Sequence, residues 1–340
     1  MAAALVPRAP LCRSHARIAP AMVSSMEARL RALVAEHGVF TRKEALAAGY
    51  HDHAIQGLVR NGAWVRVRRG AYVFGDGWAG LSDNQRYAIL CRAAVRQART
   101  HVILSHTSSA GEYDAPLWEC DLSTVHLTRS DERAGRAEAG IVQHRGVLEE
   151  GDTVQRNGRE VMSATRTALE LTLVLDVEHA LVEIDHLLHR GLTTIEELRT
   201  RYESMTHWPR SLATDLVLRL ADGRSESVGE TRARFLCWAQ HLPAPIPNYP
   251  IHDERGVEIA RVDLAWPHLG VFLEFDGKVK YLAYRREGES VVDCVLREKQ
   301  RESRICEITG WRCIRIVWAD LYKPAATASR IRTLFLRPAA

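Results

Sequence analysis

The sequence lacks any apolar run near the 18 consecutive residues that a membrane-spanning helix requires. It also has few cysteines, seven in 340 residues, at wide spacing and without a Cys-x-x-Cys pair. An odd and scattered set of thiols indicates neither a disulfide framework nor a zinc knuckle. These absences predict a cytoplasmic protein with reduced cysteines and no membrane partner.

Several catalytic motifs are also absent. No Gly-x-Ser-x-Gly occurs, so a serine hydrolase of the nucleophile-elbow type is unsupported. Ser105 and His106 are adjacent, and neighbours on a strand point to opposite faces. His51-Asp52-His53 lacks the companion ligands of a zinc site. Without Gly-x-Gly-x-x-Gly or a phosphate-binding loop, chemistry driven by a nucleotide is not indicated.

What is present is a globular composition, with 46% hydrophobic and 26% charged residues. The formal net charge is only +4, so a polyanionic partner must be sought in local clusters of basic residues. The length suggests two or three domains. The patterns described below predict an α/β (α+β multidomain) class. We expect a disordered leader at 1–24, a winged helix-turn-helix at 25–78, a mixed α/β scaffold at 81–220 and an α/β/α core at 225–338.

Residues 26–73 read as three short helices followed by a β-hairpin. Thr41 and Glu44 form a capping box at the start of the second helix, which Gly49 ends. The alternating run 64–73 predicts two strands around a turn. This order is typical of a winged helix-turn-helix.

Basic side chains gather at the end of the third helix and in the hairpin. Arg60, Arg66, Arg68 and Arg69 have no acidic residue between them. In a winged helix the third helix can enter a DNA major groove while wing arginines neutralise phosphates. The alternative is a docking module whose basic edge is merely solvated.

Two segments carry a family resemblance, G-V-F-T-R-K-E-A-L-A-A-G (38–49) and H-A-I-Q-G-L-V-R-N-G-A-W-V-R-V-R-R-G-A-Y-V (53–73). They resemble the N-terminal domain of AbiEi-type antitoxins of type IV toxin–antitoxin systems. The resemblance implies DNA binding, autoregulation of an operon, and a cognate toxin or a homodimer as partner.

We interpret the middle segment, residues 81–220, as a scaffold that joins the N-terminal and C-terminal functional domains. We predict a helix over 81–110, strands at 125–128 and 141–145, a helix from 162, and a helical pair over 183–198. The motifs S-H-T-S-S-A (105–110) and S-A-T-R-T-A-L-E-L (163–171) resemble the segment that follows the winged helix in AbiEi-like proteins. No catalytic residue comes with this resemblance.

The C-terminal segment predicts a helix at 227–238, a proline-rich turn, strands at 260–266 and 271–281, a helix at 291–309 and a strand at 311–318. A hairpin of the first two strands brings Asp263 beside Glu274. The period of two places Glu274, Asp276 and Lys278 on one face of the second strand.

These carboxylates need an offsetting charge, because two of them ~4 Å apart repel by roughly 4 kcal/mol at an effective dielectric of 20. A Mg²⁺ (or Mn²⁺) ion held by Asp263, Glu274 and Asp276 could activate water, with Lys278 or Lys280 stabilising the transition state. The alternative is a set of internal salt bridges that serves structure alone.

Glu230 has two interpretations. Ser227-x-x-Glu230 is a capping box, and Glu230 also lies four residues before Arg234, at salt-bridge spacing. It counts as a metal-site acid only together with the neighbouring motif.

Four sequence motifs of the C-terminal segment resemble the PD-(D/E)xK nuclease superfamily, in a branch of unknown function that is related to very-short-patch-repair endonucleases. They are S-E-S-V-G-E-T-R-A-R (225–234), A-R-V-D-L-A-W-P (260–267), E-F-D-G-K-V-K-Y (274–281) and R-E-K-Q-R-E-S-R-I-C-E-I-T-G-W-R-C-I-R (297–315). The resemblance implies a restriction-endonuclease-like core with Asp263 and Glu274 as metal ligands, Glu230 as the helix acid and Arg301 near the site. The superfamily places Lys where Asp276 stands here, which puts activity in doubt more than the fold.

Two functions therefore remain. The first is a Mg²⁺-dependent DNA endonuclease, a phosphodiester hydrolase targeted by its winged helix and acting in defence or repair. The second is an antitoxin-like transcriptional regulator with an inactive nuclease fold. The three retained carboxylates favour the first, and Asp276 in the lysine position favours the second.

Overall fold

The computed structural model describes residues 20–131, 135, 137–205, 207–277 and 291–336. The chain divides into two compact units, residues 1–82 and 83–340. Both units contain helices and a β-sheet, and the two sheets of the second unit are mixed, which confirms the predicted α/β class. Among the described residues, no helix has both the length and the apolar character needed to cross a membrane.

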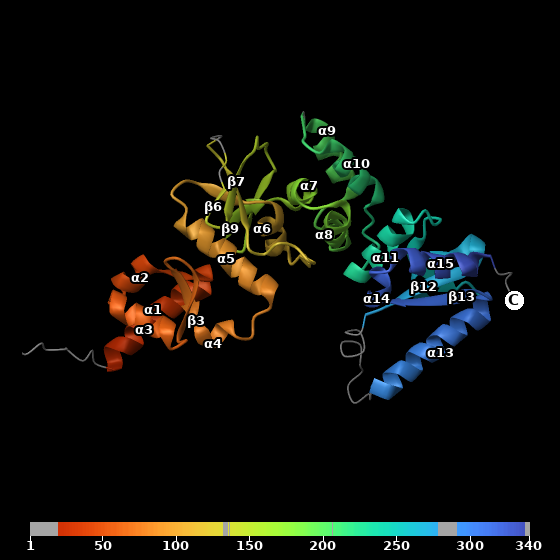
Figure 1. Ribbon diagram of the computed structural model, residues 1–340, viewed down its shortest axis with the longest axis horizontal. Coiled ribbons are helices and arrows are strands. Elements are labelled where there is room, and N and C mark those ends of the chain that lie inside the picture. Colours follow the sequence, from red (N-terminus) through yellow and green to blue (C-terminus); the bar gives the residue numbers. More distant parts are fainter. Residues whose placement is uncertain (1–19, 132–134, 136, 206, 278–290, 337–340) are drawn as a thin grey trace, which may run out of the picture. The chain divides into compact units, whose positions relative to one another are not determined.

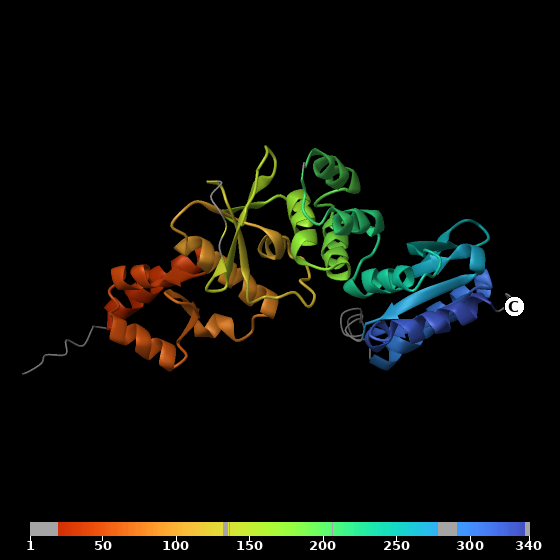
Figure 2. The ribbon, with the colours of Figure 1, turned by 45° about the horizontal axis from the view of Figure 1, so that its top comes forward.

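The first unit has the predicted order of three helices and a hairpin (Figures 1 and 2, red to orange). Its elements are α1 (Pro20–His37), β1 (Phe40–Thr41), α2 (Arg42–Ala47), α3 (Asp52–Arg60), β2 (Trp64–Arg68), β3 (Ala71–Phe74) and α4 (Gly75–Trp78). The strands form an antiparallel sheet in the order β1-β3-β2. Helix α1 begins inside the segment expected as a leader, and β1 and α4 were not predicted.

Capping and aromatic packing explain this unit. Thr41 and Glu44 form the predicted capping box of α2, and Gly49 follows that helix at φ +106°. Phe40 and Trp64 pack edge to face with ring centroids 4.6 Å apart, at the centre of the unit's hydrophobic core. Strand β1 therefore anchors the hairpin to the helices.

The first part of the second unit is a six-stranded mixed sheet with helices. Its strands are β4 (Val102–Leu104), β5 (Val125–Arg129), β6 (Ala137–Glu138), β7 (Ile141–Arg145), β8 (Thr153–Arg156) and β9 (Arg159–Met162), in the order β6-β7-β5-β4-β9-β8. Its helices are α5 (Asp83–Gln97), α6 (His106–Ala110), α7 (Ala164–Val174), α8 (Val177–His189), α9 (Ile195–Ser204) and α10 (Ser211–Leu220).

The single helix predicted over 81–110 is wrong. Helix α5 ends at Gln97, and the apolar run Val102–Leu104 forms β4, which lies inside the sheet between β5 and β9. All three residues of β4 are buried, so the strand has no alternation of polar and apolar residues. A short continuous apolar run cannot be told from a buried helix by its periodicity.

The C-terminal part of this unit is a second sheet in the order β10-β11-β12-β13. The elements are α11 (Val228–Ala239), β10 (Ile246–His252), β11 (Glu258–Trp266), β12 (Val271–Asp276), α13 (Val291–Thr309), β13 (Arg312–Val317), α14 (Trp318–Leu321) and α15 (Pro324–Phe335). Strands β11 and β12 form the predicted antiparallel hairpin, and β13 joins β12 in parallel after α13.

The proline-rich segment before this hairpin is a strand, not the predicted turn. Pro247 and Pro250 lie in β10, the edge strand of the sheet, where they pair with Leu264 and Arg261 of β11. An edge strand accepts proline because one of its sides needs no N–H donors.

Helices cover both faces of this second sheet. Leu273 and Phe275 of β12 pack with α11 and α15, whereas Phe272 packs with Ile305 of α13. Figure 1 shows α13 on one side of β12 and β13, and α11 and α15 on the other. The side chains of β12 therefore alternate between two apolar cores, as an α/β/α layering requires.

Candidate functional site

The predicted DNA-binding residues lie on α3 and the wing. Arg60, Arg66 and Arg69 are exposed, and Arg68 is half-buried. Burial lowers the pKa of Arg68, although the guanidinium stays charged at neutral pH. Glycine at position 70, with φ +78°, closes the turn between β2 and β3.

The start of α3 is held by two contacts. His51 caps the helix, its Nδ1 accepting from the amide of Ala54 at 3.2 Å. Arg42 of α2 donates two hydrogen bonds to the carboxylate of Asp52, at 2.8 and 2.6 Å. The His51-Asp52-His53 run thus helps to fix the orientation of α3.

In the C-terminal sheet the hairpin brings two predicted residues together. The β11–β12 pairing runs through Leu264 and Leu273, so Asp263 stands opposite Glu274 in the continuing register. Asp263 Oδ2 accepts a hydrogen bond from the amide of Phe275 at 2.6 Å. Both carboxylates lie on the face that α13 covers.

Arginines of α13 and β13 neutralise this face. Arg301 donates to Glu274 Oε1 at 2.9 Å, and its Nη1 donates to a main-chain carbonyl of β11 at 2.9 Å. Arg315 lies 3.8 Å from Asp276 and donates to Glu302 of α13 at 2.5 Å. Arg301 and Arg315 are therefore basic partners of Glu274 and Asp276.

Ser227 is the N-cap of α11, and its hydroxyl accepts a hydrogen bond from the amide of Glu230 at 3.3 Å. The carboxylate of Glu230 turns back to the residues before the helix. Its Oε2 accepts from the amide of Glu226 at 2.9 Å and its Oε1 from the hydroxyl of Ser227 at 2.7 Å. Lys278 and Lys280 lie outside the described residues.

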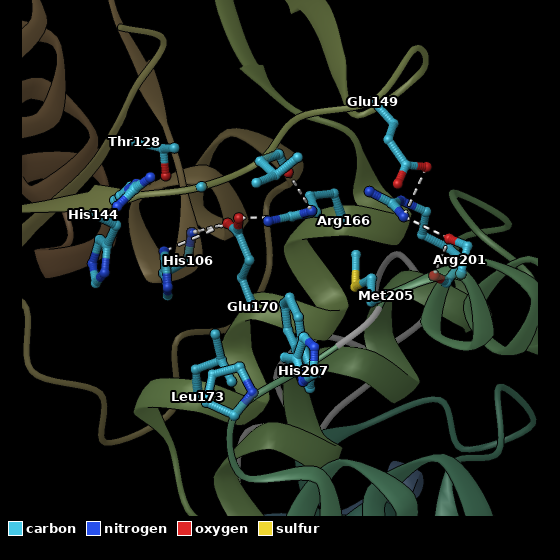
Figure 3. Close-up of a pocket in the computed structure, with 16 residues that line it drawn as sticks. His106, Thr128, His144, Glu149, Arg166, Glu170, Leu173, Arg201, Met205 and His207 are labelled. Atoms are coloured by element: carbon cyan, nitrogen blue, oxygen red, sulfur yellow. Dashed lines mark hydrogen bonds and ion pairs between the residues drawn. The ribbon is translucent and has the colours of Figure 1, made fainter. Parts of the chain in front are cut away.

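A third candidate site, which the sequence analysis did not predict, is a cavity of about 410 Å³ beside the six-stranded sheet of the second unit (Figure 3). Two arginines line it, Arg166 and Arg201, and both bind the buried carboxylate of Asp152. Asp152 accepts two hydrogen bonds from Arg201, at 2.8 and 2.7 Å, and one from Arg166 at 3.2 Å. Arg166 also donates to Glu170 at 2.9 Å. Figure 3 shows Glu170 between Arg166 and His106, linking the charged wall to a histidine.

His106 belongs to a cluster of three imidazoles, the histidine cluster, formed with His126 and His144. One ring nitrogen of each lies within 4.8 Å of the other two. Nδ1 of His126 and Nε2 of His144 are 2.8 Å apart, and the His106 and His144 rings stack at 3.8 Å. Among the described residues, this is the one group of three His, Cys, Asp or Glu side chains whose ligand atoms lie this close together. Asp263, Glu274 and Asp276 do not form a second such group.

The pKa values of all three imidazoles in the histidine cluster are lowered, which favours their neutral form at pH 7. Burial lowers the pKa of His106 well below its ordinary value, and the neighbouring imidazoles lower it further. Burial and the neighbouring His126 lower the pKa of His144 to about 4, and burial lowers that of His126. Each ring therefore presents one nitrogen lone pair at neutral pH.

Ser105 and His106 lie at the start of α6, not on one strand as the sequence argument assumed. The hydroxyl of Ser105 and Nδ1 of His106 are 3.0 Å apart, and His106 has a positive φ of 52°. Glu170 Oε2 lies 3.5 Å from the same Nδ1. A catalytic triad needs the hydroxyl and the acid on different ring nitrogens, so these residues are not arranged as one.

Sheet order explains why the sequence analysis missed the cluster. The three histidines are 20 and 18 residues apart and share no local motif. Strand β5 carries His126 and lies between β7, which carries His144, and β4, after which His106 follows. The available signal was a histidine in each of the two predicted strands at 125–128 and 141–145, and its use required the strand order and the position of His106, which fell within the predicted helix 81–110.

Known proteins resemble both units. The family model described as "Transcriptional regulator, AbiEi antitoxin" matches residues 28–75, the three helices and the wing. Two Mycobacterium tuberculosis proteins, "Uncharacterized protein Rv2248" of strain ATCC 25618 / H37Rv and "Uncharacterized protein MT2308" of strain CDC 1551 / Oshkosh, are each 31% identical over 278 residues. Each match covers 80% of this chain and 93% of the relative, and so extends well into residues 83–340. The chain therefore belongs to the family of these two mycobacterial proteins and carries an AbiEi antitoxin-type transcriptional regulator domain at its N-terminal end.

Proposed function

We propose that the protein is a DNA-binding transcriptional regulator of the antitoxin type that controls its own operon. The observation that carries this proposal is the AbiEi family match on a three-helix unit with exposed arginines on α3 and the wing. A cognate toxin is the second partner that the family description suggests.

The exposed face of α3 has the chemistry of a base-reading surface. His53, Gln56 and Arg60 are exposed and recur at i, i+3 and i+7, so they share one side of the helix. Glutamine can bind adenine through two hydrogen bonds, and arginine can bind guanine in the same way. Ile55, on the opposite side, is buried in the core and fixes the helix.

The wing supplies sequence-independent affinity. Arg66 and Arg69 are exposed beside the turn of the hairpin, where they can reach phosphates that flank the groove occupied by α3. A homodimer would place two such units on the half-sites of a palindrome.

The test uses the full chain and fluorescein-labelled duplexes that tile the region upstream of its own coding sequence, with a shuffled duplex as reference. We expect one duplex to bind at least tenfold more tightly than the shuffled one. In Arg60→Gln that preference should fall about 5- to 150-fold, the equivalent of 1–3 kcal/mol per base contact.

Arg29→Gln is the matched control, since it removes the same charge from an exposed position on α1. It should leave the preference unchanged. Equal binding of all duplexes by the wild-type protein, or equal losses in both variants, would refute base reading by α3.

A second candidate function, Mg²⁺-dependent hydrolysis of DNA, is favoured by the pairing of Asp263 with Glu274 in the hairpin. Two carboxylates suffice for Mg²⁺, which is commonly bound by one or two acids together with substrate phosphates. Arg301, already on Glu274, would stabilise phosphate charge.

Its test is the conversion of supercoiled plasmid with Mg²⁺, Mn²⁺ or EDTA, beside Glu274→Gln and Asp263→Asn. Both variants keep the size of the side chain. Nicking that requires metal and disappears in both variants supports the nuclease, and the absence of nicking in wild-type protein rejects it.

A further inference from the structure

The histidine cluster has a donor set that no role in DNA binding requires. We propose that His106, His126 and His144 form a binding site for one divalent transition-metal ion, with Zn²⁺ as the best fit. Neutral imidazole is a preferred ligand of zinc, and three protein ligands with one open position is the arrangement of zinc sites that bind water or substrate.

The spacing of the nitrogens suits one ion. With Zn–N bonds of ≈ 2.0–2.1 Å, the ligand nitrogens of a tetrahedral site are ~3.4 Å apart. The cluster has 2.8 Å between His126 and His144, and at most 4.8 Å between any two ligand atoms. The His144 ring makes an angle of 20° with the His106 ring and 16° with the His126 ring. Because the rings are nearly parallel, binding of a metal requires them to turn about their Cβ–Cγ bonds.

The main chain holds the three residues together without a metal. His126 is on β5, and the parallel pairing of β5 with β7 makes Thr128 the Cα partner of His144. The amide of Ser105 donates to the carbonyl of His126 at 3.2 Å, which fixes the start of α6 beside β5. The backbone positions of the three ligands are therefore set before a metal binds, and only the rings must reorient, which limits the entropy cost of binding.

Glu170 has the place of an outer-shell partner. Its Oε2 lies 3.5 Å from Nδ1 of His106 and accepts from the His106 amide at 3.2 Å. Arg166 in turn holds Oε1 at 2.9 Å. A carboxylate on one imidazole nitrogen leaves Nε2 of His106 for the ion and makes it a better donor, as in carboxylate–histidine–zinc arrangements.

A second observation points into the same space. Thr128 is 1% exposed, and within the described residues its Oγ1 has no hydrogen-bond partner. It lies two residues after His126, on the same face of β5, and lines the cavity with His106 and His144. A buried hydroxyl without a partner costs about 1–3 kcal/mol. A water on the fourth position of the ion would supply that partner.

The open position faces a cavity with arginines on its far wall. Arg166 and Arg201 line the same ~410 Å³ space. The exogenous ligand for such a position is a water or a small anion, since the ion and both guanidiniums favour negative charge.

The experiment titrates the apo full-length protein, prepared with a chelator that is then removed, with Zn²⁺ in competition with a chromophoric chelator. We expect one equivalent of Zn²⁺ to bind in competition with the chelator, because three imidazoles are the protein ligands of a known class of zinc site. His144→Gln should lose that equivalent or bind it at least 100-fold more weakly, and His126→Gln should do the same. The matched control is His101→Gln, at an exposed histidine of the same unit, which should bind like wild type.

Co²⁺ gives a readout that does not depend on any variant folding. Bound to the wild-type protein, it should show the intense visible absorption of a four-coordinate nitrogen site, and Zn²⁺ should displace it. Glu170→Gln should keep the stoichiometry and weaken affinity about 10- to 100-fold. Wild-type protein without that absorption, or His144→Gln with the affinity and stoichiometry of wild type, would overturn the proposal.

Discussion

Removing the carboxylate charge of Asp152 is the perturbation whose effect can be worked out most fully from the structure. Asp152 is 2% exposed and accepts four hydrogen bonds, from both arginines of the cavity wall and from the amide of Glu149. It joins α7, which carries Arg166, to α9, which carries Arg201. Asp152→Asn keeps the size of the side chain, removes its charge and replaces one acceptor oxygen with a donor.

The expected loss follows from the charges left behind. Breaking a buried ion pair by removing one partner costs about 3–5 kcal/mol. Arg166 keeps Glu170 at 2.9 Å and Arg201 keeps Glu149 at 3.0 Å, so the lower end applies. We expect a loss of about 3 kcal/mol in the free energy of unfolding, which is about 6–12 °C in Tm for a unit of this size.

The assay is urea unfolding followed by circular dichroism at pH 7, with calorimetry for Tm. Asp131→Asn is the matched control, because Asp131 is exposed and its pairing with Arg129 at the surface is worth about 0–1 kcal/mol. A loss below 1 kcal/mol in Asp152→Asn, or one equal to that of Asp131→Asn, would refute the account of this network.

Four further substitutions test other parts of the structure. Burial raises the pKa of Glu183 to about 8, so the stability it supports is fully present below pH ~4.5 and is lost as pH rises to ~8. Glu183→Gln should therefore flatten the urea-measured stability between pH 5.5 and 7.5 by about 3 kcal/mol, and parallel profiles would contradict this. Gly229→Ala would place a methyl 2.0 Å from the ring of Phe275 and should lower stability by about 1–3 kcal/mol or more, whereas Gly57→Ala, with nothing within 4 Å, should raise it by about 0.5–1 kcal/mol. Ser227→Ala removes the cap of α11 and should cost about 1 kcal/mol in thermal unfolding; an unchanged Tm would contradict the cap.

Local sequence signals predicted much of the fold. The capping pair Thr41 and Glu44, the run at 64–73 and the strand at 141–145 correspond to α2, the wing and β7. Each of these depends on residues close in sequence, whose side chains satisfy neighbouring backbone groups or alternate across one strand. Errors arose where burial removed alternation, as in β4, and where proline in an edge strand resembled a turn.

The candidate sites were predictable to different extents. The hairpin of β11 and β12 placed Asp263 beside Glu274 because a short antiparallel connection fixes the register. The pairing of Glu274 with Arg301 depends on the packing of α13 against the sheet, which local patterns do not encode. The histidine cluster was out of reach because its members meet only through the order of three strands.

The central claim is that the N-terminal unit binds DNA through α3 and the wing, and the salt dependence of binding tests it most directly. The fluorescein-labelled duplex is titrated with full-length wild-type protein and with the double variant Arg66→Gln/Arg69→Gln, and binding is followed by fluorescence anisotropy. Repeating the titration from 50 to 300 mM KCl gives the slope of log Kd against log[salt]. We predict that the double variant binds more weakly and that its slope is smaller by about 1.8, since each phosphate contact contributes about 0.9. Affinity and slope equal to those of wild type would contradict the account.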